Sequence, residues 1–192
     1  MKRNLLKNIF LSLCLVVFPM GMAAKQEATV TSPSGNLTLT AGVDKAGRPY
    51  YSLSRGKEAI LLPSYLGVKL KDGSLDSDFG VMGFVRATKD ETWHQPWGEE
   101  NDVRNHYNEL TMKLAQRKGL KRQLTIVFRV FDDGMGFRYV FPEQKNLKHF
   151  VIMDEETEFC FKGDPEAWTL PYDADYYEGL WTKAPLSKKQ KV

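Results

Sequence analysis

The stretch Gln123–Phe141, which reads QLTIVFRVFDDGMGFRYVF, decides the fold of this 192-residue chain. Apolar residues recur at every second position on both sides of the turn sequence Asp132–Gly134: Leu124, Ile126, Phe128 and Val130 before it, and Phe137, Tyr139 and Phe141 after it. A period of two places such residues on one face of a strand. The stretch therefore predicts two antiparallel strands, Gln123–Phe131 and Gly136–Phe141, joined by a tight hairpin in which Gly134 supplies a positive φ.

The same alternation continues in both directions along the chain. Further strands, separated by Gly, Pro, Asn and Asp, are predicted at Ala28–Thr31, Leu37–Thr40, Tyr50–Leu53, Ala59–Leu62, Tyr65–Leu70, Val81–Thr88, His106–Gln116, Phe150–Met153 and Glu158–Phe161. Gly83 marks an expected bulge. After residue 24, no stretch of ten residues keeps apolar residues at the i, i+3, i+4 spacing of a helix. The chain is therefore expected to be all-β, with an antiparallel β-sandwich over residues 25–165 and an exit segment over 166–192.

The N-terminal region has the three parts of a secretory signal peptide. Basic residues in Met1–Lys7 precede the apolar run Ile9–Phe18, and the small pair Ala23–Ala24 follows. This order predicts a signal peptide over residues 1–24, cleaved on export to the periplasm or the exterior. The apolar run is too short for a membrane-spanning helix, so we expect no membrane span.

Charge and cysteine content argue against a nucleic-acid-binding protein and against a disulfide-stabilised one. The chain has 27 Lys and Arg against 24 Asp and Glu, and loss of Lys2, Arg3 and Lys7 with the signal peptide balances the two signs. A nucleic-acid-binding protein would carry a basic surplus, so no nucleic-acid partner is expected. Cys160 is the one cysteine of the mature chain, so an internal disulfide is excluded. It is predicted to be a buried thiol.

The segment Glu91–Glu109 gathers the residue types that line sugar sites. It holds Trp93 and Trp97, His94 and His106, and several carboxylates. Tryptophan faces pack against the C–H faces of sugars, and carboxylates accept hydrogen bonds from their hydroxyls. Trp93, Trp97 and His106 are therefore candidate substrate-binding residues. A structural loop held by Arg104 is the alternative, and the residues alone favour it.

A second acidic segment, Pro171–Gly179, contains Asp173, Asp175 and Glu178. Three carboxylates could bind a hard cation such as calcium, although the spacing departs from an EF-hand loop. One short loop rarely fills the six to eight oxygen positions that calcium takes. The segment is therefore either a solvated loop or the donor of one ligand to a site completed elsewhere.

Several longer motifs resemble the N-terminal domain of glycoside hydrolase family 97. They are Trp93…Pro96-Trp97-Gly98-Glu99-Glu100, Val103-Arg104-Asn105-His106-Tyr107-Asn108-Glu109-Leu110, Phe128–Tyr139, Thr31–Leu37 and Trp168…Pro171…Glu178. The resemblance covers nearly all of the mature chain. It implies a β-super-sandwich at the front of an exported α-glucosidase or α-galactosidase, followed by a (β/α)-barrel with the catalytic carboxylates and a small C-terminal β-domain. It also implies calcium in the active site, with Glu178 as a ligand lent by the N-terminal domain.

The chain as given ends at Val192, where the resemblance places the start of the barrel. We therefore expect no catalytic residue within these 192 residues and no hydrolysis by this polypeptide alone; the expected partners are the barrel in cis and, through it, an oligosaccharide substrate. Two alternatives stay open. One is a free-standing periplasmic glycan-binding module that uses Trp93, Trp97 or Trp168. The other is a scaffold that braces the barrel without touching sugar. Glucoside or galactoside specificity and the stereochemical outcome depend on the barrel.

Overall fold

The computed structural model describes residues 26–170 and 178–188 of the chain. The expected signal peptide, residues 1–24, lies outside the described residues, as does segment 171–177. Within the described ranges the chain is built of strands, with one short 3-10 helix, η1 (Leu186–Lys188). The all-β prediction is therefore confirmed. No helix in the described part of the chain is long and apolar enough to cross a membrane.

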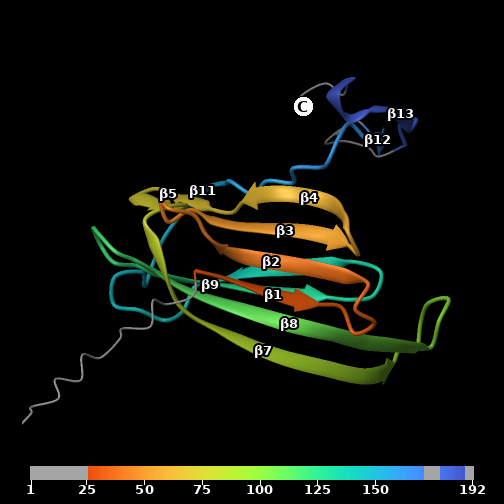
Figure 1. Cartoon of the computed structure of the whole chain (residues 1–192), viewed down its shortest axis with the longest axis horizontal. Coiled ribbons are helices and arrows are strands. Elements are labelled where there is room, and N and C mark those ends of the chain that lie inside the picture. The colour runs from red at the N-terminus through yellow and green to blue at the C-terminus, as the bar shows by residue number, and fades with distance from the viewer. Residues whose placement is uncertain (1–25, 171–177, 189–192) are drawn as a thin grey trace, which may run out of the picture.

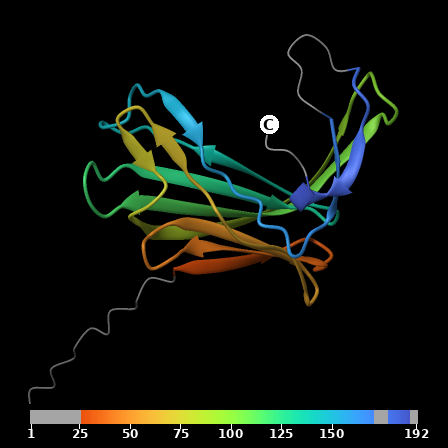
Figure 2. The same cartoon turned by 90° about the horizontal axis from the view of Figure 1, so that it is seen from above.

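Two four-stranded antiparallel sheets form the body of the molecule (Figure 1). The first has the order β1-β2-β3-β4 and consists of β1 (Glu27–Thr31), β2 (Leu37–Val43), β3 (Pro49–Arg55) and β4 (Glu58–Tyr65). The second has the order β10-β9-β8-β7 and consists of β7 (Phe79–His94), β8 (Asp102–Gln116), β9 (Gln123–Val130) and β10 (Met135–Val140). The sheets stack face to face (Figure 2), which is the predicted sandwich.

Two smaller sheets complete the described structure. A three-stranded sheet of order β11-β5-β6 contains β5 (Val68–Leu70), β6 (Gly73–Leu75) and β11 (Ile152–Glu155). A separate two-stranded sheet pairs β12 (Glu166–Thr169) with β13 (Thr182–Pro185). The three-stranded sheet lies at one end of the sandwich, and the β12–β13 hairpin stands apart from the stacked sheets (Figure 1).

The core lies between the two stacked sheets, where alternate residues of each strand face inward. Leu39 and Tyr51 of the first sheet and Leu110 and Phe128 of the second are fully buried. The rings of Tyr51 and Phe128 lie 6.0 Å apart, and Phe137 contacts both. Removal of these large apolar side chains from water is the main stabilising contribution to such a sandwich.

The edge of the first sheet is joined to the second sheet by side chains. Arg86 of β7 donates to the backbone carbonyl of Thr29 at 3.0 Å, and Asn108 of β8 donates to the carbonyl of Thr31 at 2.9 Å. These bonds satisfy acceptors that an edge strand leaves open. They also fix β7 and β8 at the point where the two strands leave the sandwich.

The hairpin predicted around Asp132–Gly134 is confirmed, with Met135 of β10 opposite Val130 of β9. The amide of Phe131 donates to the carbonyl of Gly134 at 2.8 Å and closes the turn. The role assigned to Gly134 is wrong, because Gly134 is not among the residues with a positive φ. A four-residue connection spreads the reversal over more dihedral angles than a two-residue turn does, so no left-handed residue is needed at this position.

Two predicted strands differ from the structure. Tyr65–Leu70 is split, since β4 ends at Tyr65 and β5 begins at Val68. A Cβ atom on the intervening Gly67 would lie 2.8 Å from the Cβ atom of Asp76, so the chain turns here through a space that only glycine fits. Glu158–Phe161 is not a strand, because its pairing with β4 reduces to one bridge between Leu61 and Phe161 and scattered hydrogen bonds. Cys160 is half-buried there instead of buried.

Strand β7 runs from Phe79 to His94 and is twice as long as the predicted strand Val81–Thr88. The register shifts between Val81 and Gly83, which confirms the bulge expected at Gly83. The polar run after Thr88 hides the second half from an apolar pattern, yet it pairs with β8 as far as His94 and Asp102. Strands β6, β12 and β13 were not predicted, because they are short and carry few buried apolar residues.

Candidate functional site

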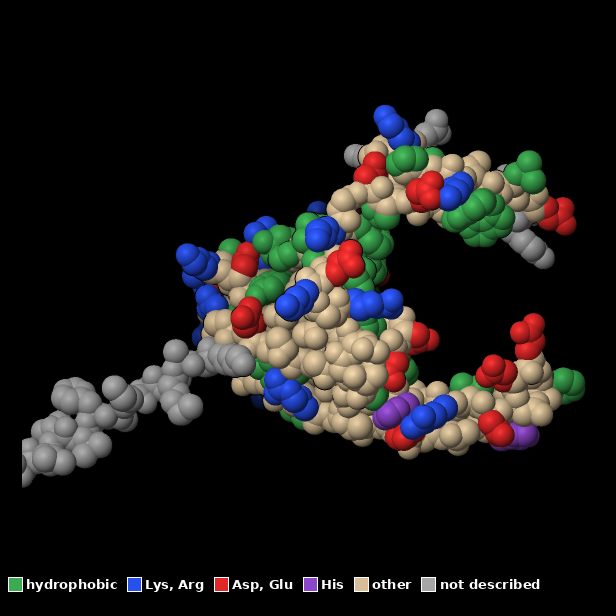
Figure 3. Space-filling view, turned by 45° about the vertical axis from the view of Figure 1, so that its right-hand side comes forward, with side chains coloured by type: hydrophobic (Ala, Val, Ile, Leu, Met, Phe, Trp, Pro, Cys, Tyr) green, Lys and Arg blue, Asp and Glu red, His purple; other side chains and the backbone are tan. Residues whose placement is uncertain are grey.

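Two arms project from the sandwich on the same side. The first is the part of β7 and β8 that continues past the end of β9, which pairs with β8 only from Asn108 onward. We call this two-stranded extension, residues 88–108, the long ribbon. The second is the β12–β13 hairpin, here called the exit arm. Figure 3 shows an open hollow between the two arms, with the exit arm above and the long ribbon below.

One face of the long ribbon carries a charged cluster. Arg104 donates two hydrogen bonds to Asp90, at 2.8 Å from Nε and 2.7 Å from Nη2. His106 Nε2 lies 3.9 Å from Oδ2 of the same carboxylate. The hydrogen bonds from Arg104 hold the pKa of the Asp90 carboxyl below its usual range. Arg104 therefore organises this segment as the sequence suggested, although the segment is a paired ribbon and not a loop.

The opposite face of the long ribbon carries Trp93. Trp93 is paired with Val103, whereas His106 is paired with Asp90, three positions from Trp93 along β7. An odd spacing in a strand places side chains on opposite faces, so Trp93 and His106 do not face one ligand. On the face of Trp93, Asn105 donates to Glu91 at 2.9 Å, and Lys89 contacts Glu91 at 2.7 Å.

The tip of the long ribbon holds Trp97, whose side chain is 84% exposed. Gln95 closes the tip, since its amide donates to the carbonyl of Asn101 and its side chain donates to the carbonyl of Glu100, both at 2.8 Å. Gly98 has a φ of 119°, a conformation that other residues rarely adopt. The tip is thus an ordered turn that presents Trp97 to solvent.

The exit arm is held closed by polar contacts along its length. Thr169 and Thr182 lie opposite each other with their hydroxyl oxygens 3.2 Å apart. Beyond the strands, Asp164 accepts from the amide of Ser187 at 2.8 Å and from its hydroxyl at 2.7 Å. These bonds lower the pKa of the Asp164 carboxyl.

The exit arm carries Trp168, Leu180 and Trp181, which are 62%, 87% and 62% exposed. Hydrophobic side chains of this arm lie on the side that faces the hollow (Figure 3). Trp168 is a candidate from the sequence, whereas Trp181 is not. Trp181 and Lys183 alternate with Thr182 and Ala184, but four residues are too few to predict a strand.

Glu178, the predicted calcium ligand, is exposed and follows segment 171–177 directly. Asp173 and Asp175 lie outside the described residues. Among the described residues no group of three or more metal-ligating side chains gathers. A free, exposed carboxylate fits the role of a single donor, because calcium accepts one or two oxygens from each of several carboxylates. The remaining ligands would have to come from elsewhere.

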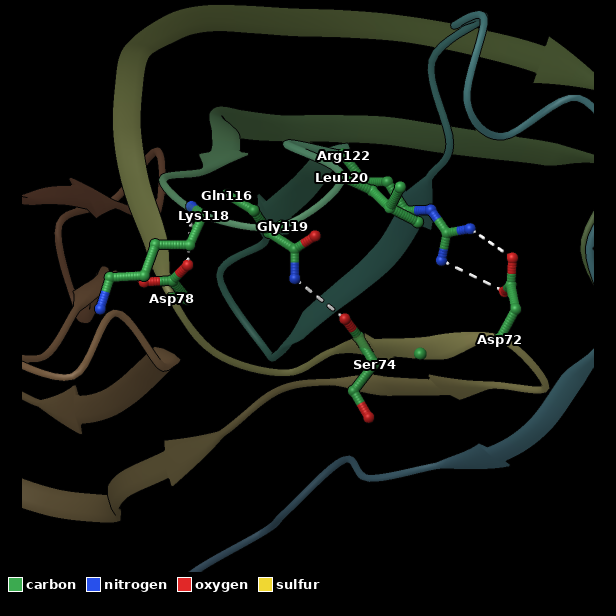
Figure 4. A pocket seen from close by; sticks show the side chains of 9 residues that line it. Asp72, Ser74, Asp78, Gln116, Lys118, Gly119, Leu120 and Arg122 are labelled. Atoms are coloured by element: carbon green, nitrogen blue, oxygen red, sulfur yellow. Dashed lines mark hydrogen bonds and ion pairs between the residues drawn. The ribbon is translucent and has the colours of Figure 1, made fainter.

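A polar depression of about 320 Å³ lies at the opposite end of the sandwich, near β6 and the β8–β9 connection (Figure 4). Its side chains are engaged with one another: Arg122, which is nearly buried, donates to Asp72, and Gln116 donates to the carbonyl of Ser74 at 2.9 Å. Asp78 accepts from the amide of Lys118 at 2.8 Å. These contacts join the small sheet to the sandwich, so the depression is explained as a structural junction.

Comparison with known proteins identifies the whole arrangement. Residues 30–192 match the family described as Glycosyl-hydrolase 97 N-terminal. A retaining alpha-galactosidase of Bacteroides thetaiotaomicron is 30% identical over 96% of the chain, and a probable retaining alpha-galactosidase of Streptomyces bingchenggensis is 26% identical over 95%. The chain spans 28% of the length of each of these relatives.

Solved structures agree with the sequence matches. A glycoside hydrolase family 97 enzyme from Pseudoalteromonas sp. strain K8, in complex with panose, superposes with a TM-score of 0.78 at 31% identity, over 84% of this chain and 25% of that one. A beta-arabinopyranosidase superposes with a TM-score of 0.67 at 27% identity, over 74% and 22%. The family match covers both arms and the sandwich between them, and the chain therefore belongs to the family of glycosyl hydrolase 97 N-terminal domains.

Proposed function

We propose that this chain is the N-terminal domain of an exported, calcium-dependent α-glycosidase and braces a catalytic barrel that occupies the hollow between its two arms. The observation that carries the proposal is the hollow itself, flanked by a long ribbon that exposes Trp93 and Trp97 and an exit arm that exposes Leu180. Large aromatic side chains exposed together are typical of a surface that meets a partner. The relatives are more than three times as long as this chain and thus have room for such a partner in cis.

In this proposal Glu178 lends one carboxylate to a calcium site completed by the barrel. The carboxylate is exposed in the connection between β12 and β13, and no ion pair among the described residues would have to be broken before it binds a cation. When bound, calcium would polarise the substrate or stabilise developing negative charge. The part played by this chain is to hold one of its oxygen ligands in place.

The substrate contacts proposed for Trp93 and Trp97 belong to the assembled enzyme, where the end of the long ribbon would border the barrel. His106 lies on the other face of the ribbon, with Nε2 3.9 Å from Oδ2 of Asp90, so we propose no joint sugar contact for His106 and Trp93.

The test is complementation between separately produced parts. The mature chain alone should not cleave an aryl α-galactoside or α-glucoside, and a barrel fragment encoded downstream should be weakly active. Mixing the two should raise the activity in a calcium-dependent manner, and the Glu178→Gln variant should fail to do so. The matched control, Glu143→Gln at an exposed carboxylate that follows β10, should complement fully. Hydrolysis by the mature chain alone, or equal complementation by Glu178→Gln, would refute the proposal.

A further inference from the structure

We propose that Trp168 and Trp181 form a sugar-binding platform on the exit arm, separate from the long ribbon and usable by the isolated chain. The inference rests on the proposed function in one respect, the choice of an oligosaccharide as the ligand. Two exposed tryptophans on one face of the exit arm offer what a glycan needs, flat apolar surfaces on which the C–H faces of pyranose rings can stack.

The strand register places the two rings together. Trp168 lies directly opposite Lys183, and Trp181 precedes Lys183 by two residues. Trp181 directly precedes β13 (Thr182–Pro185), and an extended chain at this point places its side chain on the face of Lys183 and Trp168, diagonally across from Trp168. The other side carries the contact between Thr169 and Thr182. The two tryptophans therefore form one apolar surface and not two separate exposed side chains.

A polar pair borders this surface. Lys183 Nζ contacts Glu166 Oε2 at 2.6 Å and lies 5.9 Å from the centre of the Trp168 ring. Both charged groups are on the face of Trp168, because Glu166 precedes Trp168 by two residues. An ammonium and a carboxylate at the rim can donate to and accept from the hydroxyl groups that project from the edge of a stacked sugar.

The ion pair also distinguishes a sugar from a protein surface as the occupant. Burial of Lys183 and Glu166 beneath a packed protein interface would remove both charges from water, at a cost that their mutual attraction seldom recovers. A bound oligosaccharide leaves the rim hydrated. The Lys183–Glu166 ion pair would then stay in contact with water, while the sugar displaces water from the faces of the tryptophan rings. The mixture of two rings and one salt bridge therefore favours a wet, carbohydrate-binding face.

The platform also lies where a substrate would have to pass. Trp181 is three residues from Glu178, the proposed calcium ligand, and hydrophobic side chains of the same arm face the hollow (Figure 3). A glycan held on this face would extend from the proposed calcium site along the exit arm. The platform would then bind the part of an oligosaccharide that lies beyond the bond being cleaved.

The experiment is a titration of the mature chain with panose and, separately, with raffinose, an α-galactoside trisaccharide, followed through the indole N–H signals of the four tryptophans by NMR. We expect saturable shifts at Trp168 and Trp181 and none at Trp93 or Trp97. Trp168→Ala and Trp181→Ala should each weaken binding at least about tenfold, whereas Trp168→Phe should retain most of it. Leu120→Ala, at an exposed apolar position at the opposite end of the sandwich, should bind as the parent chain does.

The outcomes separate this inference from the proposed function. Absence of a saturable shift with both sugars, or saturable shifts confined to Trp93 and Trp97, overturns the platform. Shifts of both indole signals on addition of the barrel fragment but not of sugar would also overturn it and identify a protein contact instead. Neither result affects complementation by Glu178, and failure of complementation would leave direct binding of sugar by this chain standing.

Discussion

Asp90 and Arg104 clamp the two strands of the long ribbon together beyond the sandwich, through two hydrogen bonds that cross from β7 to β8. The pair lies where no third strand supports the ribbon, because the pairing of β9 with β8 ends at Asn108. An exposed pair contributes little to global stability, but here it acts on a part of the fold that has few other contacts.

Replacing Asp90 with Asn should therefore loosen the ribbon without unfolding the domain. The amide would keep one weaker contact with Arg104 and lose the charge-assisted pair. We expect faster amide hydrogen exchange in residues 89–94 and 102–107, with an unchanged melting temperature. Glu99→Gln at the tip is the control and should leave exchange unchanged; a lower melting temperature in Asp90→Asn would show that the clamp supports the sandwich itself.

The same clamp should respond to acid. The hydrogen bonds from Arg104 lower the pKa of Asp90, so the ribbon is favoured at pH values above the usual pKa of an aspartate. This contribution is lost as the pH falls through the depressed pKa of the folded state. Exchange in the ribbon should thus increase in the acidic range of the parent chain, and the increase should be absent in Asp90→Asn.

The contact between Tyr51 and Phe128 predicts the largest stability effect. Phe128→Ala removes a fully buried ring that touches Tyr51 and Phe137 and leaves a cavity between the sheets. Such substitutions cost about 3–5 kcal/mol of unfolding free energy. Urea denaturation measures this loss of unfolding free energy. The control Val151→Ala, at a half-exposed position, should change the unfolding free energy by no more than about 0.5 kcal/mol.

Alkaline conditions should destabilise the domain through two tyrosines. Burial raises the pKa of Tyr51 to about 12, and burial together with the hydrogen bond to Glu27 raises that of Tyr50 to about 12. Both phenols remain protonated in the folded chain at pH values where unfolded tyrosine ionises. Their contribution is present below about pH 10 and is lost as the pH rises toward 12. Phenolate absorbance should rise together with unfolding, and Tyr50→Phe should reduce this dependence on pH.

The isolated chain should bind hydrophobic dyes at its two arms. The tryptophans of the arms are half or more exposed to water, so a dye such as ANS should fluoresce on binding. Addition of the barrel fragment should reduce that fluorescence. A dye signal that is insensitive to the fragment would place the exposed apolar surface away from the interface proposed here.

The sandwich could be predicted because its evidence is local. Apolar residues at every second position in Leu124–Val130 and Phe137–Phe141 indicate that one face of each strand is buried. Sheets with one buried face stack on each other. The second half of β7 could not be found in this way. Its residues Lys89–Glu91 are charged on both faces, since a two-stranded ribbon in water has no buried side.

The arrangement of the candidate site was less accessible to sequence reasoning. Trp93 and His106 are close in the sequence segment that suggested a sugar site, yet the register of β7 with β8 separates them by face. That register depends on the bulge next to Gly83 and on the turn at the tip, and composition does not encode either in detail. Conversely, the pairing of β12 with β13 places Trp168 opposite Lys183, close to Trp181 in the chain, and this relationship is not visible in the sequence.

Ser187 and Asp164 give the exit arm an independence that matters for assembly. Their two hydrogen bonds bring the ends of a 24-residue excursion together before any other domain is present. The conformational entropy of closing that loop is therefore lost during folding of this domain and not during docking. In the proposed enzyme, the barrel would therefore meet an exit arm whose ends are already joined.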